Sequence, residues 1–160
     1  MTSTRTALLT AVTIETPEHI ETLRQIRNAC ASGFVYDHSE VSPQRQRAWW
    51  SFMRDRVHAW LYLMPDADPV GYGLVRQTDD GRWWNSIAVL PRYRGQGFGA
   101  YITADVLRRH PYPVYATVCL DNLGAALMHH VADWEEVELD LTNGLLTLRS
   151  RQSAHERTDS

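Results

Sequence analysis

The stretch from Ile87 to Gly99 constrains the fold of this chain more than any other. An apolar, β-prone run stops at Pro91, and a loop that holds three glycines and two arginines follows it. From Ala100 to His110 the pattern is helical. A strand, an amide-rich loop and a helix N-terminus in this order direct main-chain N–H groups and the positive end of the helix dipole at one point. The segment predicts a phosphate site, because glycine has no Cβ to block a close approach.

Two common phosphate-binding loops do not fit this segment. A Walker loop requires Gly-x-x-x-x-Gly-Lys-Ser/Thr, and the chain contains no lysine. A dinucleotide-binding loop requires Gly-x-Gly-x-x-Gly, whereas the glycines here are spaced Gly-x-Gly-x-Gly. The spacing that fits is Arg-x-x-Gly-x-Gly, at Arg94, Gly97 and Gly99. It resembles the pyrophosphate loop of the GNAT family of N-acetyltransferases, which bind acetyl-CoA.

A second block, at the right distance, strengthens this resemblance. In the family the strand before the loop ends in Val-x-Pro, which residues 89–91 match. A later pattern of the family resembles Asn-x-x-Ala-x-x-x-Tyr-x-x-x-Gly-Phe. The corresponding residues here are Asn122, Ala125, His129, Asp133 and Trp134. The resemblance covers residues 6–150 of the chain.

The predicted elements follow the order of that family. Strands are expected at 6–14, 57–64, 70–77, 83–90, 114–120, 135–141 and 145–150, and helices at 16–30, from 42 onward, at 100–110 and after 122. Thr16 and Ser42, each followed by proline, are expected helix caps, and Asn143-Gly144 is a hairpin signal. The resemblance implies an α/β (α+β) fold, with a mixed, mostly antiparallel sheet flanked by helices and splayed between its fourth and fifth strands.

The resemblance also implies that acetyl-CoA is the co-substrate and that its pantetheine arm enters the splayed seam. An arm that carries amides can pair with open main-chain groups as a strand would. The residues that we expect to bind the coenzyme are Ile87, Val89, Arg92, Arg94, Gly95, Gln96, Gly97, Phe98, Gly99 and Asn122. Asn122 has an alternative role as a helix cap. The rings of Tyr93 and Phe98 are expected to pack the loop against the sheet.

His129 is the candidate general acid. Acetyl transfer to an amine benefits from a donor for the oxyanion and a proton for the departing thiolate. The family usually supplies that proton from the Tyr of its second block, and an imidazole at the matching place can also donate one. A histidine without a catalytic task is the alternative. Several relatives have a Glu base where this chain has Trp83, so water or an acid from another loop would replace it, with Glu40 as the candidate base.

Candidates for the acceptor site come from two regions of the chain. They are Arg27, Asn28, Tyr36, His38, Trp83 and Asn85. Arg27-Asn28, followed by Gln46 and Trp49-Trp50, resembles a bacterial branch that acetylates amino groups of nucleotide-linked aminosugars. Three functions stay open: N-acetylation of a small-molecule primary amine such as an aminosugar or modified nucleotide, non-catalytic acyl-CoA binding as a sensor or partner module, and N-acetylation of proteins.

The bulk composition limits the partners. A length of 160 residues suits a single domain, expected at 1–150 with a disordered tail at 151–160. A net charge of -3 gives no support for nucleic-acid binding, and no apolar run has the length of a membrane span. Cys30, Cys119 and the histidines have no metal-ligand spacing, so no metal is expected. We expect a cytoplasmic enzyme that could form a homodimer.

Overall fold

The computed structural model describes residues 9–31, 39–119 and 134–151. In these residues one sheet of seven strands runs in the order β1-β2-β3-β4-β5-β7-β6. The strands are β1 Thr10–Thr13, β2 Val57–Leu63, β3 Pro69–Gln77, β4 Trp83–Val89, β5 Val114–Cys119, β6 Trp134–Asp140 and β7 Leu145–Ser150. The helices are α1 Pro17–Ala29, α2 Pro43–Met53 and α3 Phe98–Arg109, with 3-10 turns η3 at Arg54–Arg56 and η4 at Pro91–Tyr93.

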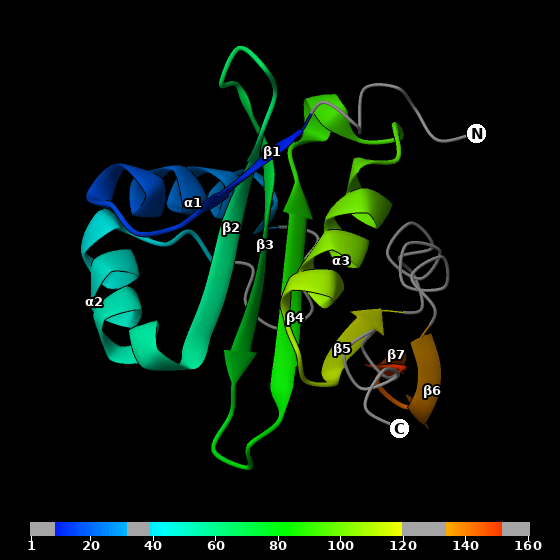
Figure 1. Ribbon diagram of the computed structural model, residues 1–160. Coiled ribbons are helices and arrows are strands. Elements are labelled where there is room, and N and C mark those ends of the chain that lie inside the picture. Colours follow the sequence, from blue (N-terminus) through cyan, green and yellow to red (C-terminus); the bar gives the residue numbers. More distant parts are fainter. Residues whose placement is uncertain (1–8, 32–38, 120–133, 152–160) are drawn as a thin grey trace.

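β4 and β5 form the parallel pair of the described sheet, and they pair at two positions alone. Trp83 lies opposite Val114 and Trp84 lies opposite Tyr115. The other neighbouring strands pair antiparallel. Beyond these two positions β4 and β5 diverge towards their carboxyl ends (Figure 1). The mixed sheet and its splay between the fourth and fifth strands were expected from the family resemblance, and the structure confirms both.

The helix ends follow the local signals of the sequence. Thr16 Oγ1 accepts a hydrogen bond from the main-chain N–H of His19, and His19 Nδ1 accepts one from that of Thr16, so α1 begins with a reciprocal capping box. Ser42 Oγ accepts from the N–H of Arg45 at the start of α2. α3 begins at Phe98, two residues before the expected start at Ala100. β1 is shorter than expected, at four residues, and the helix expected after residue 122 lies outside the described residues.

The sheet separates two apolar clusters. On one face, Ile102 and Val106 of α3 pack against Tyr62 and Val75. On the other face, Leu23 and other residues of α1 pack against the strands, with α2 beside them. Figure 1 shows α3 on one side of the sheet and α1 with α2 on the other. Because successive side chains of a strand alternate between faces, each residue of β4 and β5 is assigned to the α1 face or the α3 face by its position alone.

A buried carboxylate fastens α3 to β2. Asp105 is 2% exposed, and its Oδ2 accepts hydrogen bonds of 2.7 Å from the Tyr62 hydroxyl and of 2.7 Å from Arg109 Nε. Arg108 also donates to this carboxylate. Burial raises the pKa of the Tyr62 phenol, and the hydrogen bond to Asp105 adds to that rise, so Tyr62 stays a neutral donor. The contact fixes how α3, and the loop that leads into it, lie over the sheet.

Two glycines in β3 let its neighbours approach closely. A Cβ on Gly71 would lie 2.1 Å from the main-chain oxygen of Ala88 in β4. A Cβ on Gly73 would lie 2.5 Å from a methyl group of Val106 and 2.9 Å from one of Ile102 in α3. The first obstacle is backbone and cannot rotate away, whereas the second consists of side-chain methyl groups that can shift.

Alanine at these two glycines should therefore destabilise the fold to different degrees. We expect Gly71→Ala to lower the free energy of unfolding by about 3 kcal/mol or more, and Gly73→Ala by about 1–2 kcal/mol. Equilibrium urea unfolding of both variants and the wild type measures the two differences. Equal costs, or a larger cost at Gly73, would show that β3 and β4 are not packed as described.

Candidate functional site

The loop between β4 and α3 presents main-chain donors at the start of a helix. Gly95 and Gly97 have φ angles of 75° and 85°, which favour glycine. No main-chain acceptor for the N–H groups of these two glycines lies in the described part of the chain. Gly97 is the N-cap of α3, and no side chain caps this helix. The first-turn N–H groups of α3 therefore point outward beside those of the loop.

This helix start differs from the other two in the described residues. The starts of α1 and α2 are each closed by an N-cap side chain, from Thr16 and Ser42. α3 has a glycine at that place and no acidic residue in its first turn. Open donors together with the positive end of the helix dipole suit a bound anion.

The main-chain groups of β4 that face β5 belong to the positions expected from the sequence. The N–H of Leu90 donates to the carbonyl of Val70 in β3 at 2.9 Å. Main-chain groups alternate between the two edges of a strand, so those of Ile87 and Val89 face β5. The register of β4 with β3 continues without a bulge through these residues. Since β5 pairs with β4 no further than Trp84, the two residues flank an open seam.

The carbonyl of Val89 has two partners at the mouth of this seam. Arg94 Nε donates to it at 3.1 Å, and the Cys30 thiol donates to it at 3.3 Å. Burial raises the pKa of the Cys30 thiol, and the nearby Arg94 opposes that rise. Arg94 is exposed on its outer side. Its guanidinium is therefore held at the carboxyl end of β4, beside the mouth of the seam.

Arg92 is engaged away from the loop. Its guanidinium forms an ion pair with Asp68 at 3.1 Å, and the Tyr93 hydroxyl donates to the same carboxylate. These contacts lower the pKa of Asp68, the hydrogen bond from Tyr93 most of all. The Phe98 ring is buried and meets the Tyr93 ring edge-on, with centroids 5.7 Å apart. The two rings hold the loop against the sheet, as expected.

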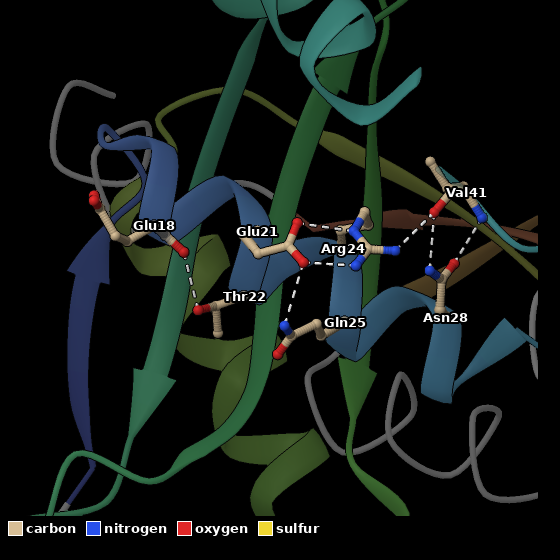
Figure 2. A network of polar contacts seen from close by, with 7 residues as sticks. All are labelled: Glu18, Glu21, Thr22, Arg24, Gln25, Asn28 and Val41. Carbon is tan, nitrogen blue, oxygen red and sulfur yellow. Dashed lines mark hydrogen bonds and ion pairs between the residues drawn. The ribbon is translucent and has the colours of Figure 1, made fainter. Parts of the chain in front are cut away.

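On the α1 face, Arg27 and Asn28, which were predicted to contact the acceptor, form hydrogen bonds with the segment that precedes α2. Asn28 Nδ2 donates to the carbonyl of Val41 at 3.0 Å, and Asn28 Oδ1 accepts from its N–H at 2.8 Å. Arg24 donates to the same carbonyl while its other nitrogens pair with Glu21 (Figure 2). Arg27 donates to the carbonyl of Ser39. These bonds fix residues 39–41 beside the end of α1.

The remaining predicted residues do not come together in one place. Glu40 is exposed in the segment held by Asn28. Trp83 packs on the α3 face against His110, with centroids 4.6 Å apart, and alternation puts Asn85 on that face too. The sheet therefore separates this pair from Asn28. Tyr36, His38, Asn122 and His129, which carry four of the predictions, lie outside the described residues.

Sequence reasoning missed three side chains beside the seam on the α1 face. Trp84 and Ser86 lie there because Ala88, two residues further along β4, packs with the α1 cluster. Tyr115 lies there because its neighbours Val114 and Ala116 pack in the α3 cluster. The alternation of side chains follows from the strand assignment itself. Which set of alternate residues faces α1 could not be predicted, because it depends on where the helices pack.

A hollow of about 500 Å³ lies elsewhere, at the end of β1. Its lining includes Glu15 and Ile20 near the start of α1, Trp50 and Arg54 near the end of α2, and His58 in β2. None of its lining residues belongs to β4, β5 or the glycine loop, so the seam, and not this hollow, is the candidate site. In the described residues no group of three His, Cys, Asp or Glu side chains is arranged to hold a metal ion. No described helix is long and apolar enough to span a membrane.

Comparison with known proteins agrees with this geometry. Residues 20–133 match the model of the Acetyltransferase (GNAT) family. No curated protein matches the chain in sequence. Of the solved structures, phosphinothricin acetyltransferase from Sinorhizobium meliloti, in complex with AcCoA, has a TM-score of 0.78 at 14% identity, over 91% of this chain and 89% of that one.

Two further structures share the fold and have other names. A ribosomal-protein-alanine N-acetyltransferase from Brucella melitensis has a TM-score of 0.73 at 19% identity, over 88% of this chain and 98% of that one. Spermidine N-acetyltransferase from Vibrio cholerae, in complex with CoA and spermine, has a TM-score of 0.71 at 13% identity, over 89% and 94%. Identities this low show the fold and leave the acceptor open.

The ring cluster around Trp83 has a buried histidine at its centre. His110, the C-cap of α3, is 2% exposed, and its Nε2 has no hydrogen-bond partner in the described chain. Burial, and to a lesser extent the neighbouring His58, lower its pKa from 6.5 to about 4. The fold therefore holds His110 neutral at pH values where the unfolded chain protonates it.

His110 should make stability depend on pH. Between pH 6.5 and 4 the unfolded chain binds more protons than the folded one, so the free energy of unfolding falls as the pH falls through this interval. His110→Leu removes this titration, and its unfolding free energy should fall less between pH 7 and 4. Urea unfolding across that range compares the two proteins. His58→Asn is the control and should keep most of the dependence, because burial of His110 persists; curves of wild type and His110→Leu that stay parallel would contradict the prediction.

Proposed function

The chain belongs to the acetyltransferase (GNAT) family, and on that premise we propose that it moves the acetyl group of acetyl-CoA to a primary amine of a small molecule. The observation that carries the proposal is the uncapped start of α3, which lies behind a glycine loop at the mouth of an open seam between β4 and β5. A coenzyme with a diphosphate and an amide-bearing arm needs both features. The cytoplasm stays the predicted location, and a homodimer stays a prediction.

The residues beside the seam fit the two halves of this coenzyme. The N–H groups of Gly95, Gly97 and the first turn of α3 suit the diphosphate. The edge groups of Ile87 and Val89 suit the amides of the arm, because a strand edge pairs with any extended chain that carries amides. Gln96 and Asn122 stay predicted contacts to the coenzyme, and the latter lies outside the described residues.

Of the two loop arginines, Arg94 is the stronger candidate for the diphosphate. It is exposed beside the glycine loop, and in the described residues its guanidinium donates to a main-chain carbonyl, that of Val89, and lies near the Cys30 thiol, with no carboxylate bound to it. Exchange of this neutral acceptor for a phosphate oxygen would form a stronger, charge-assisted hydrogen bond and free the Val89 carbonyl for the arm. Arg92 already has a carboxylate partner in Asp68, so a phosphate contact would have to compete with that ion pair.

The proposed reaction is direct acyl transfer. The neutral amine attacks the thioester carbonyl, a C–N bond forms as the C–S bond breaks, the nitrogen loses one proton and the departing sulfur gains one. We expect a main-chain N–H on the β5 side of β4 to donate to the oxyanion. His129 stays the predicted donor to sulfur. Glu40 stays a predicted base, and its exposure leaves a water relay as the alternative.

The class of acceptor amine can be narrowed from the structures that share the fold and from the charge of the chain. Solved structures with this fold are named for phosphinothricin, spermidine and a ribosomal-protein alanine, so the fold admits small amines and a protein amine alike. Net negative charge suits a small amine better than an anionic polymer. A nucleotide-linked aminosugar stays a lead from the sequence. A non-catalytic acyl-CoA sensor is the second candidate, favoured by the tryptophan at the place where relatives have a glutamate.

Thiol release separates these functions. The protein is incubated with acetyl-CoA and, in turn, a set of small primary amines and a set of peptides, and free CoA is measured with a thiol reagent. Release with small amines supports the proposal, and release with peptides alone favours a protein acetyltransferase. Binding of acetyl-CoA without release on any amine favours the sensor.

Gly97→Ala should weaken coenzyme binding, because the new methyl group narrows the approach to the helix start and φ is 85° there. We expect a loss of about ten-fold or more in the affinity for CoA, measured by calorimetry. Gly81→Ala is the matched control: Gly81 also has a φ of 85° but lies in an exposed turn, with nothing within 4 Å of a Cβ. Equal losses in both variants, or no binding heat from the wild type at millimolar acetyl-CoA, would refute the proposed site.

A further inference from the structure

The rings of Trp84 and Tyr115 are in contact across the closed end of the seam, and the proposed reaction does not use them. The ring centroids of Trp84 and Tyr115 are 5.4 Å apart, with planes tilted by 36°. The two residues are opposite one another in the last β4–β5 pair before the strands diverge. The guanidinium of Arg82 lies over the Tyr115 ring, 5.0 Å from its centre. The rings therefore form a braced wall at the narrow end of the seam, on the α1 face.

Beyond this wall the side chains on the same face are small. Alternation along β4 puts Ser86 next after Trp84, and along β5 it puts Thr117 next after Tyr115. The opposite face is filled, since Val114 is fully buried, Ala116 is 2% exposed and both belong to the α3 cluster. On the α1 face a group in the seam therefore meets small side chains, with the Tyr72 hydroxyl 3.5 Å from Ser86 Oγ, and at the closed end it meets the ring pair.

The coenzyme arm has the length to bring its acyl group to this wall. α3 runs back along β4, because His110 at its end contacts Trp83 at the beginning of that strand. The start of α3, and with it the diphosphate site, is thus level with Val89. About twelve bonds join the phosphate-ester oxygen of pantetheine to its sulfur, and a residue has three main-chain bonds, so the arm spans about four residues. Counted back from Val89 toward the start of β4, the thioester comes level with Asn85, which is adjacent to Trp84.

We propose that the ring pair of Trp84 and Tyr115 limits the length of the acyl group that the seam accepts. The inference rests on the proposed function, and it assigns specificity for the donor. An acetyl group ends before the rings. Each further methylene in line with the arm meets the wall, and to avoid the wall it has to turn toward Ser86 and Thr117 on the α1 face.

The test measures binding, so it does not require the acceptor to be known. Calorimetry gives the dissociation constants of CoA, acetyl-CoA, butyryl-CoA and hexanoyl-CoA for the wild type and for Trp84→Ala. For the wild type we expect affinity to fall by about ten-fold or more from acetyl-CoA to hexanoyl-CoA. For Trp84→Ala we expect this ratio to shrink to about three-fold or less, with the affinity for CoA itself unchanged.

Tyr112→Ala is the matched control. Tyr112 is exposed on the α3 side of the same end of the sheet, where its ring stacks on Trp83. Its removal loosens the end of the sheet without opening the wall, so the wild-type ratio should persist. Circular dichroism and urea unfolding establish that each variant is folded. Tyr115→Ser replaces Trp84→Ala if the latter does not fold, and it should shrink the ratio in the same way.

Three outcomes would overturn the proposal: a wild type that binds all acyl forms equally, a folded Trp84→Ala that keeps the wild-type ratio, or a Tyr112→Ala that shrinks the ratio as much. A wild type that does not bind CoA itself would overturn the proposed function, and the limit on acyl length with it. A wild type that binds CoA but shows no dependence on chain length would leave the proposed function standing and remove this inference alone.

Discussion

The early end of the pairing between β4 and β5 is the constraint on which the site depends. Two residue pairs hold the strands together, while the other edge of β5 pairs with β7 from Tyr115 to Cys119. A sheet interior normally satisfies its main-chain groups from both sides. Where β5 has left, the edge groups of Ile87 and Val89 face the seam, and the Val89 carbonyl accepts hydrogen bonds from Arg94 and Cys30. An extended chain of amides can pair with such an edge. The proposed coenzyme site in the seam is thus made of backbone.

The second requirement is that the helix start remains fixed relative to that seam. The Asp105 carboxylate, bound by Tyr62 and Arg109, fastens α3 to β2, and Gly73 lets the helix approach β3 closely. The pair of Arg92 with Asp68 fastens the glycine loop to the turn between β2 and β3. An exposed ion pair contributes little to stability, so its value here lies in the position of the loop.

Local signals in the sequence predicted much of the fold. Thr16 and Ser42, each before a proline, marked two helix starts that the structure confirms through their hydrogen bonds. The glycine loop predicted a helix start with open main-chain N–H groups, and the structure has no side-chain cap there. These features depend on neighbours within four residues, so the sequence contains them directly. Even so, the start of α3 was placed two residues late, because Phe98 was assigned to the loop although its ring belongs to the core.

The acceptor side was less accessible to prediction. Asn28 was assigned to the acceptor, yet its carboxamide forms both of its described bonds with Val41, thirteen residues away. Trp83 was chosen by counting back from the loop, and that count could not tell which face of the sheet it occupies. The structure puts it on the α3 face, against His110. Local sequence does not determine contacts that depend on the path of a loop or on which face of the sheet a strand residue occupies.

By itself, the sequence determined the described elements, their order and a loop of glycines that predicts an anion-binding backbone. It did so because caps, turns and glycine conformations depend on a few adjacent residues. Tertiary structure alone decided that Trp84 and Tyr115, thirty-one positions apart, meet as rings at the end of the seam. That contact depends on the register of a parallel pair, which is set by the packing of α3 and the crossover that contains it.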